Sequence, residues 1–446
     1  ELTATPNDSN VVHLYAFGGG IYHTDSGTVT IQGVTAIENN RAVATVAMGS
    51  VTLTTNNYNT SSSANAYGGG IYSLGGTWNL TGTTSIVDNQ AVATAQRAGT
   101  LQVSAADVAI TATSAYPYAS VSVQDNFPAE AYGGGVYADN STWILSGTTV
   151  ISGNSARATS TQSAAYTLTG GDAIASGTDA YAYAFTQFNS QADSNARGGG
   201  VYTRNGGTWT LSGTTTIIGN SALATSTNSA DITLISGNAT ATGSDEARAY
   251  ASAYANSYVS ANARGGGMYI SGGVWMLSGT TVINGNSALA TSTNTSESSI
   301  TAGNAIASAP SAIASASAEI NASALTSADG GGVWTNGGSG SWTLSGTTSI
   351  SQNTALATSS NSAGFNAVSG TAIAPSTSRY VSTRARAESS AMGGGFFGDR
   401  IIWTARDVEF ADNSALADVQ NTSQTASGGQ SYSTATAEAR GGGMHI

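Results

Sequence analysis

Polar and apolar residues alternate with a period of two along most of the chain, which is the pattern of β-strands with one buried face. In the longest example, 247–263, Ala takes most odd positions, and Arg, Tyr, Ser and Asn take the even ones. A helix would scatter these alanines around its circumference, so the pattern favours a strand despite the high helix propensity of Ala. We expect the Ala face to pack closely against another sheet and the opposite face to meet solvent or a partner.

Gly triplets divide the chain into repeats that are about 65 residues long in the centre. The triplets begin at Gly18, Gly68, Gly133, Gly198, Gly265, Gly330, Gly393 and Gly441. Such self-similarity has to be interpreted before any local motif. It predicts a single repetitive unit over 1–446, with a cap or partial turn at 1–17, seven repeats over 18–440 and the start of an eighth turn at 441–446.

Each triplet is followed by one apolar residue and then, usually, by an aromatic residue, which together predict a short first strand. Two further strand segments follow, separated by a Ser-Gly or Thr-Gly corner. The second strand carries a Trp in six repeats, at Trp78, Trp143, Trp209, Trp275, Trp342 and Trp403. The third ends at an Asn, at Asn40, Asn89, Asn154, Asn220, Asn286, Asn353 and Asn413. Equivalent residues of stacked turns reinforce one another. We therefore expect an aromatic stack of tryptophans and a structural ladder of asparagines that exchange amide hydrogen bonds.

These features predict an all-β fold, a right-handed parallel β-solenoid of about seven turns. Each corner requires Gly because the backbone turns through conformations that a Cβ would obstruct. The segment from each Asn to the next triplet varies, short at both ends of the chain and long in the middle. We interpret it as a long Ala-alternating strand excursion that extends the wall, for example out along 221–235, around a turn near 236–238 and back. Three narrow turns per repeat is the alternative, but the excursions lack the Gly corners and aliphatic register of the constant part.

Only 9% of the residues are charged, all basic residues are Arg, there is no Cys, and the net charge is −12. The charge is spread thinly and forms no basic stripe, which argues against nucleic acid as a partner. With so few charges, we expect the surface polarity to come from Ser, Thr, Asn and Gln, which is typical of secreted fibres and adhesins. The sequence contains no run of about 20 apolar residues, which is the length needed to span a membrane. Because residue 1 is Glu, we expect the numbering to start after processing or within a longer gene product.

The residue types needed for chemistry do not cluster. His13, His23 and His445 lie near the chain ends without metal-ligand spacing, and Asp and Glu do not recur on the constant strands. No Gly-Lys-Ser/Thr follows the Gly triplets, so they are not phosphate loops. We expect no enzymatic activity, no catalytic residues, no metal and no cofactor.

The Gly-Gly-Gly-Ile-Tyr element, paired with Ile-x-x-Asn or, once, with Phe410-Ala411-Asp412-Asn413, resembles the repeats of the polymorphic outer membrane proteins. These repeats occur in chlamydial autotransporters and other large bacterial surface proteins. The resemblance covers nearly the whole chain and implies a parallel β-helix passenger, cell-surface display, adhesion and self-association. The chain departs from the family pattern by the third Gly, by Ile in place of Phe in most repeats and by the long insertions.

Three functional hypotheses follow. The first is an extracellular structural protein, a subunit of a self-associating surface fibre whose exposed strand edges pair end to end or laterally with other copies. The second is a surface adhesin that binds glycans or another cell through a Tyr- and Asn-rich contact face. Its candidate residues are Tyr181, Tyr183, Tyr250, Tyr254 and Tyr258. The third is recognition of ice or a mineral surface by Thr arrays such as Thr214-Thr215-Thr216.

Overall fold

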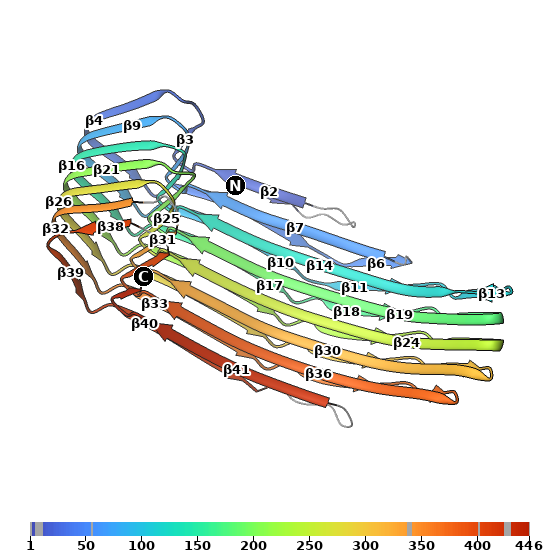
Figure 1. The fold of residues 1–446 in the computed structure, drawn as a ribbon. Coiled ribbons are helices and arrows are strands. Elements are labelled where there is room, and N and C mark those ends of the chain that lie inside the picture. The colour runs from blue at the N-terminus through green and yellow to red at the C-terminus, as the bar shows by residue number, and fades with distance from the viewer. Residues whose placement is uncertain are drawn as a thin grey trace.

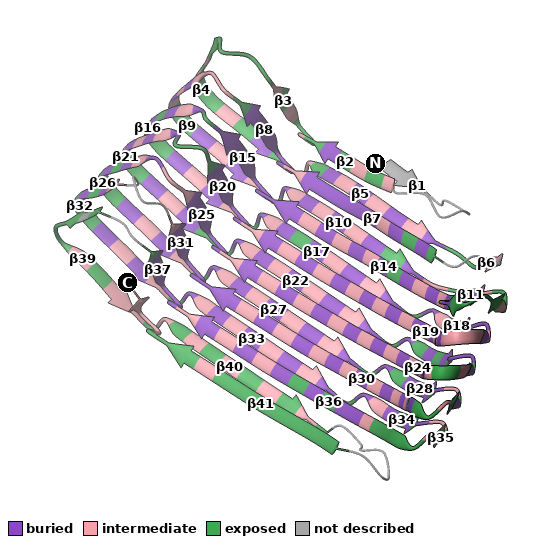
Figure 2. Ribbon diagram, turned by 45° about the vertical axis from the view of Figure 1, so that its right-hand side comes forward, coloured by how far each residue is buried: buried purple, intermediate pink, exposed green. Residues whose placement is uncertain are grey.

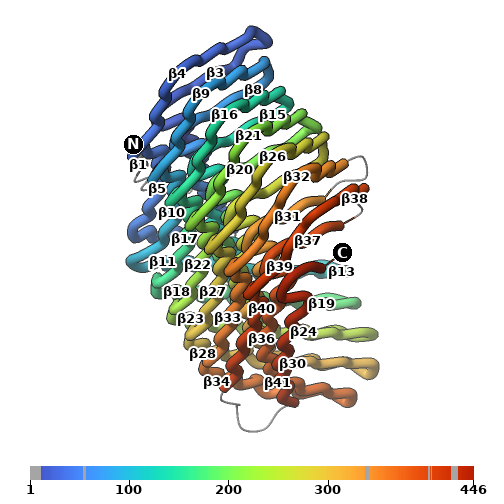
Figure 3. Tube along the Cα trace, turned by 90° about the vertical axis from the view of Figure 1, so that its left-hand side faces the viewer, coloured from blue at the N-terminus to red at the C-terminus, as the bar shows by residue number. Residues whose placement is uncertain are grey.

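The computed structural model of the protein describes residues 2–4, 12–54, 57–336, 341–399, 402–422 and 430–445. In this part of the chain the regular secondary structure is β-strand, and neighbouring strands pair in parallel with the residues one repeat further along the chain. Trp143 pairs with Trp209, and Ala249 pairs with Ala314. Each repeat is therefore one coil of a parallel β-solenoid, and the alternative of three narrow turns per repeat is wrong. Figures 1 and 3 show the coils stacked from β4 at one edge to β41 at the other.

Five stacks of strands build the coil, and the chain visits them in a fixed order. The Tyr sheet comes first after each triplet and contains β3 (Ile21–His23), β8 (Ile71–Leu74), β15 (Val136–Asp139), β20 (Val201–Arg204), β25 (Met268–Ser271), β31 (Val333–Asn336), β37 (Phe396–Asp399) and β42 (Met444–His445). The Trp sheet follows with β4 (Thr28–Glu38), β9 (Thr77–Val87), β16 (Thr142–Ser152), β21 (Thr208–Ile218), β26 (Val274–Asn284), β32 (Ser341–Ser351), β38 (Ile402–Ala405) and β39 (Val408–Ala411).

Beyond the Asn, the chain enters a convex sheet and then a distal convex sheet. The convex sheet contains β1 (Leu2–Ala4), β5 (Arg41–Met48), β10 (Gln90–Arg97), β17 (Ser155–Gln162), β22 (Ser221–Asn228), β27 (Ser287–Asn294), β33 (Thr354–Asn361) and β40 (Ser414–Asn421). The distal convex sheet contains β6 (Val51–Thr54), β11 (Thr100–Ser104), β18 (Ala165–Thr169), β23 (Asp231–Ile235), β28 (Glu297–Thr301) and β34 (Gly364–Val368).

The chain returns through the concave sheet to the next triplet. The long strands of this sheet are β2 (Val12–Phe17), β7 (Asn57–Tyr67), β14 (Tyr118–Tyr132), β19 (Ala173–Arg197), β24 (Ala239–Arg264), β30 (Ser311–Asp329), β36 (Ser376–Met392) and β41 (Gln430–Arg440). Short strands extend it at the far end, namely β12 (Val108–Thr111), β13 (Ser114–Ala115), β29 (Ala305–Ser308) and β35 (Ala372–Ile373).

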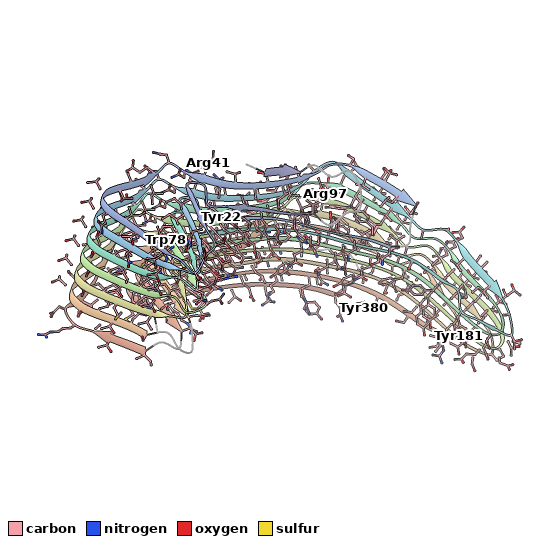
Figure 4. All side chains as sticks on the ribbon, turned by 90° about the horizontal axis from the view of Figure 1, so that it is seen from above. Tyr22, Arg41, Trp78, Arg97, Tyr181 and Tyr380 are labelled. Atoms are coloured by element: carbon pink, nitrogen blue, oxygen red, sulfur yellow. The ribbon has the colours of Figure 1, made fainter. Side chains whose placement is uncertain are left out.

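The Tyr and Trp sheets enclose a head, and the other three sheets form a long, thin arm that arches away from it (Figures 1 and 4). From β7 to β41 the long strands of the concave sheet have 11, 15, 25, 26, 19, 17 and 11 residues, of which β19 and β24 include the end of the outward leg. The arm is therefore shorter in the coils of β7 and β41 than in the middle coils. The excursions predicted from the variable segments therefore exist, and their changing length shapes the arm.

The Gly triplet pinches the coil at a waist between head and arm. The first glycine turns the chain, since Gly133 has φ +63°, a region that residues with a Cβ rarely adopt. The second glycine touches the opposite wall, because a Cβ at Gly134 would lie 2.4 Å from the carbonyl carbon of Ser155. A Cβ at Gly135 would lie 3.0 Å from Cγ of Asn154. The triplet thus combines a corner with backbone contact across the coil.

Head and arm have different cores. The head is filled by the apolar residue after each triplet and by Trp, Leu and Ile of the Trp sheet, such as Val136, Trp143 and Ile151. The arm is filled largely by Ala, whose methyl groups let its two walls approach closely, as at Ala158 and Ala263. Buried and half-buried residues alternate along most of each long strand of the middle coils (Figure 2), and the alternation is interrupted in β19 and β24 near the reversal of the chain. The predicted inward Ala face is confirmed, since Ala247, Ala249 and the other alanines of β24 are buried.

Two local predictions are wrong. The Ser-Gly corner is not a corner, because Gly147 lies inside the continuous strand β16, where its φ of +100° bends the strand without ending it. The turn near 236–238 is not the reversal of the excursion. The chain continues outward through Ala239 and Ala241, which pack in one cluster with Ala247 and Ala249. It reverses at Gly243, where a Cβ would lie 2.1 Å from the carbonyl oxygen of Glu246.

The segments at both ends of the chain add strands to the same sheets. In 1–17, the described strands β1 and β2 pair with β5 and β7, so this segment forms part of a coil. In 441–446, β42 pairs with β37 and continues the Tyr sheet.

Candidate interaction surfaces

The asparagines at the waist form a continuous ladder. Asn154 Nδ2 donates to the carbonyl oxygen of Ile86 in the preceding coil (2.8 Å) and to Asn220 Oδ1 in the following coil (2.9 Å). Its Oδ1 accepts hydrogen bonds from the backbone N–H and from Nδ2 of Asn89, both at 3.0 Å. The ladder is Asn40, Asn89, Asn154, Asn220, Asn286, Asn353 and Asn413. Because these side chains satisfy one another inside the coil, they leave no amide of the middle coils available for a ligand.

A second polar ladder, not anticipated from the sequence, crosses the interior of the arm. It occupies the last residue of the convex strands, at Arg97, Gln162, Asn228, Asn294, Asn361 and Asn421. Asn228 is fully buried, and its Nδ2 donates to Ser190 Oγ (2.9 Å) and Ser257 Oγ (2.8 Å) of the concave sheet. The ladder thus connects the two walls of the arm. Its signal is the recurring Asn eight residues after the first ladder, within the segment interpreted as variable.

The second coil places a charge on this ladder. Arg97 and Asp125 are both fully buried, and Arg97 Nε lies 3.5 Å from Asp125 Oδ2. Tyr166 of the next coil donates its hydroxyl hydrogen to the same carboxylate oxygen. Burial raises the pKa of Asp125 to about 6, against the attraction of Arg97. Burial also raises the pKa of Tyr166, which keeps its hydroxyl protonated as a donor.

The tryptophans of the head form the expected stack. The ring centroids of Trp143 and Trp209 are 4.8 Å apart with planes at 8°, and those of Trp209 and Trp275 are 4.8 Å apart at 4°. Trp78 and Trp342 extend the column at either end. The strand register continues it to Trp403, whose side chain lies outside the described part. At most 2% of the Trp78, Trp143, Trp209, Trp275 and Trp342 side chains is exposed, so this stack belongs to the core and not to a surface.

A separate aromatic column fills the outer crease between head and arm. It contains the aromatic residue that follows each triplet, at Tyr22, Tyr72, Tyr137, Tyr202, Tyr269, Trp334 and Phe397. The guanidinium of Arg197, from the concave sheet, lies over the rings of Tyr132 and Tyr269. The middle of the column is buried, whereas Tyr22 at one end is 57% exposed.

The tyrosines of the predicted contact face all lie on the outer side of the concave sheet, and Figure 4 shows Tyr181 and Tyr380 on the concave side of the arm. Tyr183 stacks on Tyr250, with centroids 5.1 Å apart and planes at 7°. Tyr181 donates a hydrogen bond to Glu246, which raises the pKa of Tyr181 to about 12. Tyr254 and Tyr258 lie further along β24 and line two separate hollows. The five residues therefore share one face of the sheet but lie at three separate positions along it: Tyr181, Tyr183 and Tyr250 at the first, Tyr254 at the second and Tyr258 at the third.

The Thr run 214–216 does not present three hydroxyls on one side. Thr215 faces the interior of the head with 2% exposure. Thr214 is exposed and pairs with Thr148 and Thr280 in the neighbouring coils, so one column of Thr faces outward from the Trp sheet.

The two edges of the stack are open among the described residues. In each sheet the first and the last strand have a neighbour on one side only. The edge near β2 and β3 exposes Tyr15, Phe17 and Tyr22, which border a hollow of about 420 Å³. At the opposite edge, β41 is mostly exposed and β40 alternates between exposed and half-buried residues (Figure 2). His445 ends the aromatic column there by stacking on Phe397.

Among the residues that the structure describes, no three His, Asp or Glu side chains lie close enough to hold a metal ion. The same residues contain no helix of the length and hydropathy needed to cross a membrane.

No protein-family model matches the chain, and no curated protein or solved structure is significantly similar to it. The geometry itself defines the class: a parallel β-solenoid repeat protein with a pinched coil, a Trp-filled head and an Ala-filled arm.

Proposed function

We propose that the protein is an extracellular structural protein, a subunit of a fibre or filament that associates with further copies through the open edges of its solenoid. The observation that carries this proposal is that, among the described residues, the first and the last strand of each sheet have a neighbour on one side only. Exposed edge strands favour pairing with another chain, and natural sheets usually cover or charge them to prevent it.

The two edges are complementary in the Tyr and concave sheets. If β3 of one copy paired with β42 of the next, Tyr22 would stack over His445 and lengthen the aromatic column. If β2 then paired with β41, Phe17 would lie over Arg440. Head-to-tail contacts continue the stack of coils from one copy to the next, and such contacts produce linear assemblies where the rotation between copies does not close a ring.

Composition and resemblance support display outside a cell. The chain has no Cys and only 9% charged residues, and its paired glycine and asparagine elements resemble those of the polymorphic outer membrane protein repeats. Immunogold labelling of intact cells tests this part of the proposal, because an internal location would contradict it.

Association is tested by analytical ultracentrifugation and electron microscopy of the purified chain over a range of concentrations. We expect concentration-dependent linear assemblies, and monodisperse short particles at high concentration would overturn the proposal. Ala435→Arg places a charge on the inner side of the edge strand β41, and Tyr22→Ser removes the exposed ring at the other edge. Both should weaken association, whereas Thr436→Arg, on the outer face of β41, should not.

A further inference from the structure

The outer face of the concave sheet contains a hollow of about 330 Å³ over β19, β24 and β30. The hollow exists because side-chain size changes within one column of the sheet. Phe185, Ser252 and Ser317 are paired neighbours in successive coils, so a large ring in one coil is followed by two small hydroxyl side chains in the next two. Tyr254, two residues from Ser252 on β24, borders the hollow with its ring.

Polar groups surround the two rings. Asn321 Nδ2 donates to the hydroxyl of Tyr254 (3.0 Å) and to Glu319 Oε1 (3.2 Å), which holds both side chains in place. Gln187 also lines the hollow, and its amide makes no hydrogen bond to any described residue. The site therefore offers fixed aromatic surface together with amide and carboxylate groups.

A second hollow of about 300 Å³ lies further along the same face, bordered by Tyr258, Asn262 and Leu325. Tyr254 and Tyr258 are four residues apart on one extended strand, which corresponds to about 13 Å. Asn256 faces outward between them. Two ring-bordered hollows joined by an amide form a track that suits a chain-like ligand better than a compact one.

We propose that this track binds a neutral polysaccharide, with Phe185 and Tyr254 stacking on the apolar faces of sugar rings and Gln187 and Glu319 bonding to their hydroxyls. Sugar rings combine C–H faces with hydroxyl groups, which matches a site of aromatic surface and a few convergent polar groups. Glu319 in the first hollow disfavours an anionic chain through like-charge repulsion, whereas Glu388 in the second hollow is paired with Arg386 (2.6 Å) and adds little net charge. This binding function is additional to association through the edges.

The track is tested by calorimetry with neutral oligosaccharide series, namely β-glucan, chitin, xylan and mannan fragments of increasing length, and with heparin and alginate as anionic probes. We expect binding to at least one neutral series, with affinity that rises with chain length. Phe185→Ser combined with Tyr254→Ser should lower the affinity at least about tenfold. Tyr22→Ser, which removes an exposed ring outside the concave face, should leave the affinity unchanged.

The same variants separate binding from association, since Tyr22→Ser should weaken assembly and the Phe185/Tyr254 variant should not. Gln187→Ala, which removes only an outward amide, provides a second measurement if the double variant fails to fold and should also weaken binding. Absence of binding to all four neutral series would overturn the proposal. Binding of the anionic probes alone, or affinity that neither the double variant nor Gln187→Ala lowers, would overturn it equally.

Discussion

Gly134 and Ser155 lie on opposite walls of one coil with their backbones in contact, so that a Cβ on Gly134 would come within 2.4 Å of the Ser155 carbonyl carbon. This contact separates the Trp-filled head from the Ala-filled arm. It also brings the Asn ladder next to the triplet, since Asn154 lies beside Gly135. The waist is thus a point where any added atom requires both walls to move.

Gly134→Ala is expected to destabilise the fold strongly. The new methyl group meets backbone atoms of Ser155 and Gly199, which cannot rotate away, so we expect a loss of about 3 kcal/mol or more in the free energy of unfolding. Gly364→Ala is the control, because its nearest neighbour is Glu297 Cγ at 3.8 Å. Urea unfolding of both variants checks the prediction, and equal midpoints would contradict the steric account of the waist.

Asn220→Ala should break the ladder in the middle of the stack. The backbone N–H and Nδ2 of Asn154 lose their acceptor, and the carbonyl of Ile151 loses its donor. Buried unsatisfied polar groups cost about 1–3 kcal/mol each, so we expect a loss of about 3–5 kcal/mol. Asn256→Ala removes an outward amide and should change the stability by less than about 0.5 kcal/mol. A similar effect of both substitutions would show that the ladder is not a main source of stability.

The buried charge pair can be replaced by its counterpart from the next coil. The residues paired with Arg97 and Asp125 there are Gln162 and Ser190, which hydrogen-bond to each other. Arg97→Gln alone leaves a buried carboxylate unpaired and should cost about 3–5 kcal/mol. Combining it with Asp125→Ser and Tyr166→Phe removes the charges and the orphaned hydroxyl, and the triple variant should be at least as stable as the wild type. Thermal unfolding of the wild type and both variants checks this, and a triple variant less stable than the wild type would contradict the prediction.

The pH dependence of stability should reveal Asp125. Its pKa in the folded state is raised by burial to about 6, above the value of about 3.9 for an unfolded chain. The folded state therefore binds this proton more tightly than the unfolded state, and the contribution is fully present below pH about 4 and is lost as the pH rises through about 6. The free energy of unfolding of the wild type, minus that of the triple variant, should fall between these pH values and stay constant above them. A difference that rises with pH would refute the assignment.

The Asn and Trp columns were predictable because each depends on one residue type that recurs at the same position in all or nearly all repeats. Such a residue must stack on its own copy once the strands are parallel and in register, as Trp143 does on Trp209. The inward Ala face of β24 followed in the same way from the alternation of side chains along a strand. The second polar ladder was missed because its first two members are Arg97 and Gln162, so that Asn marks the column only from Asn228 onward, within a segment interpreted as variable.

The sequence by itself determined the strand periodicity, the parallel stacking of one repeat on the next and the corner at the first glycine of each triplet. Local conformation and self-pairing suffice for these features. Only the tertiary structure decided where the coil is pinched, where the excursion reverses and where the concave face is hollowed. These depend on contacts between different segments: the second glycine is required by Ser155 across the coil, and the hollow exists because Phe185 of one coil lies beside Ser252 of the next.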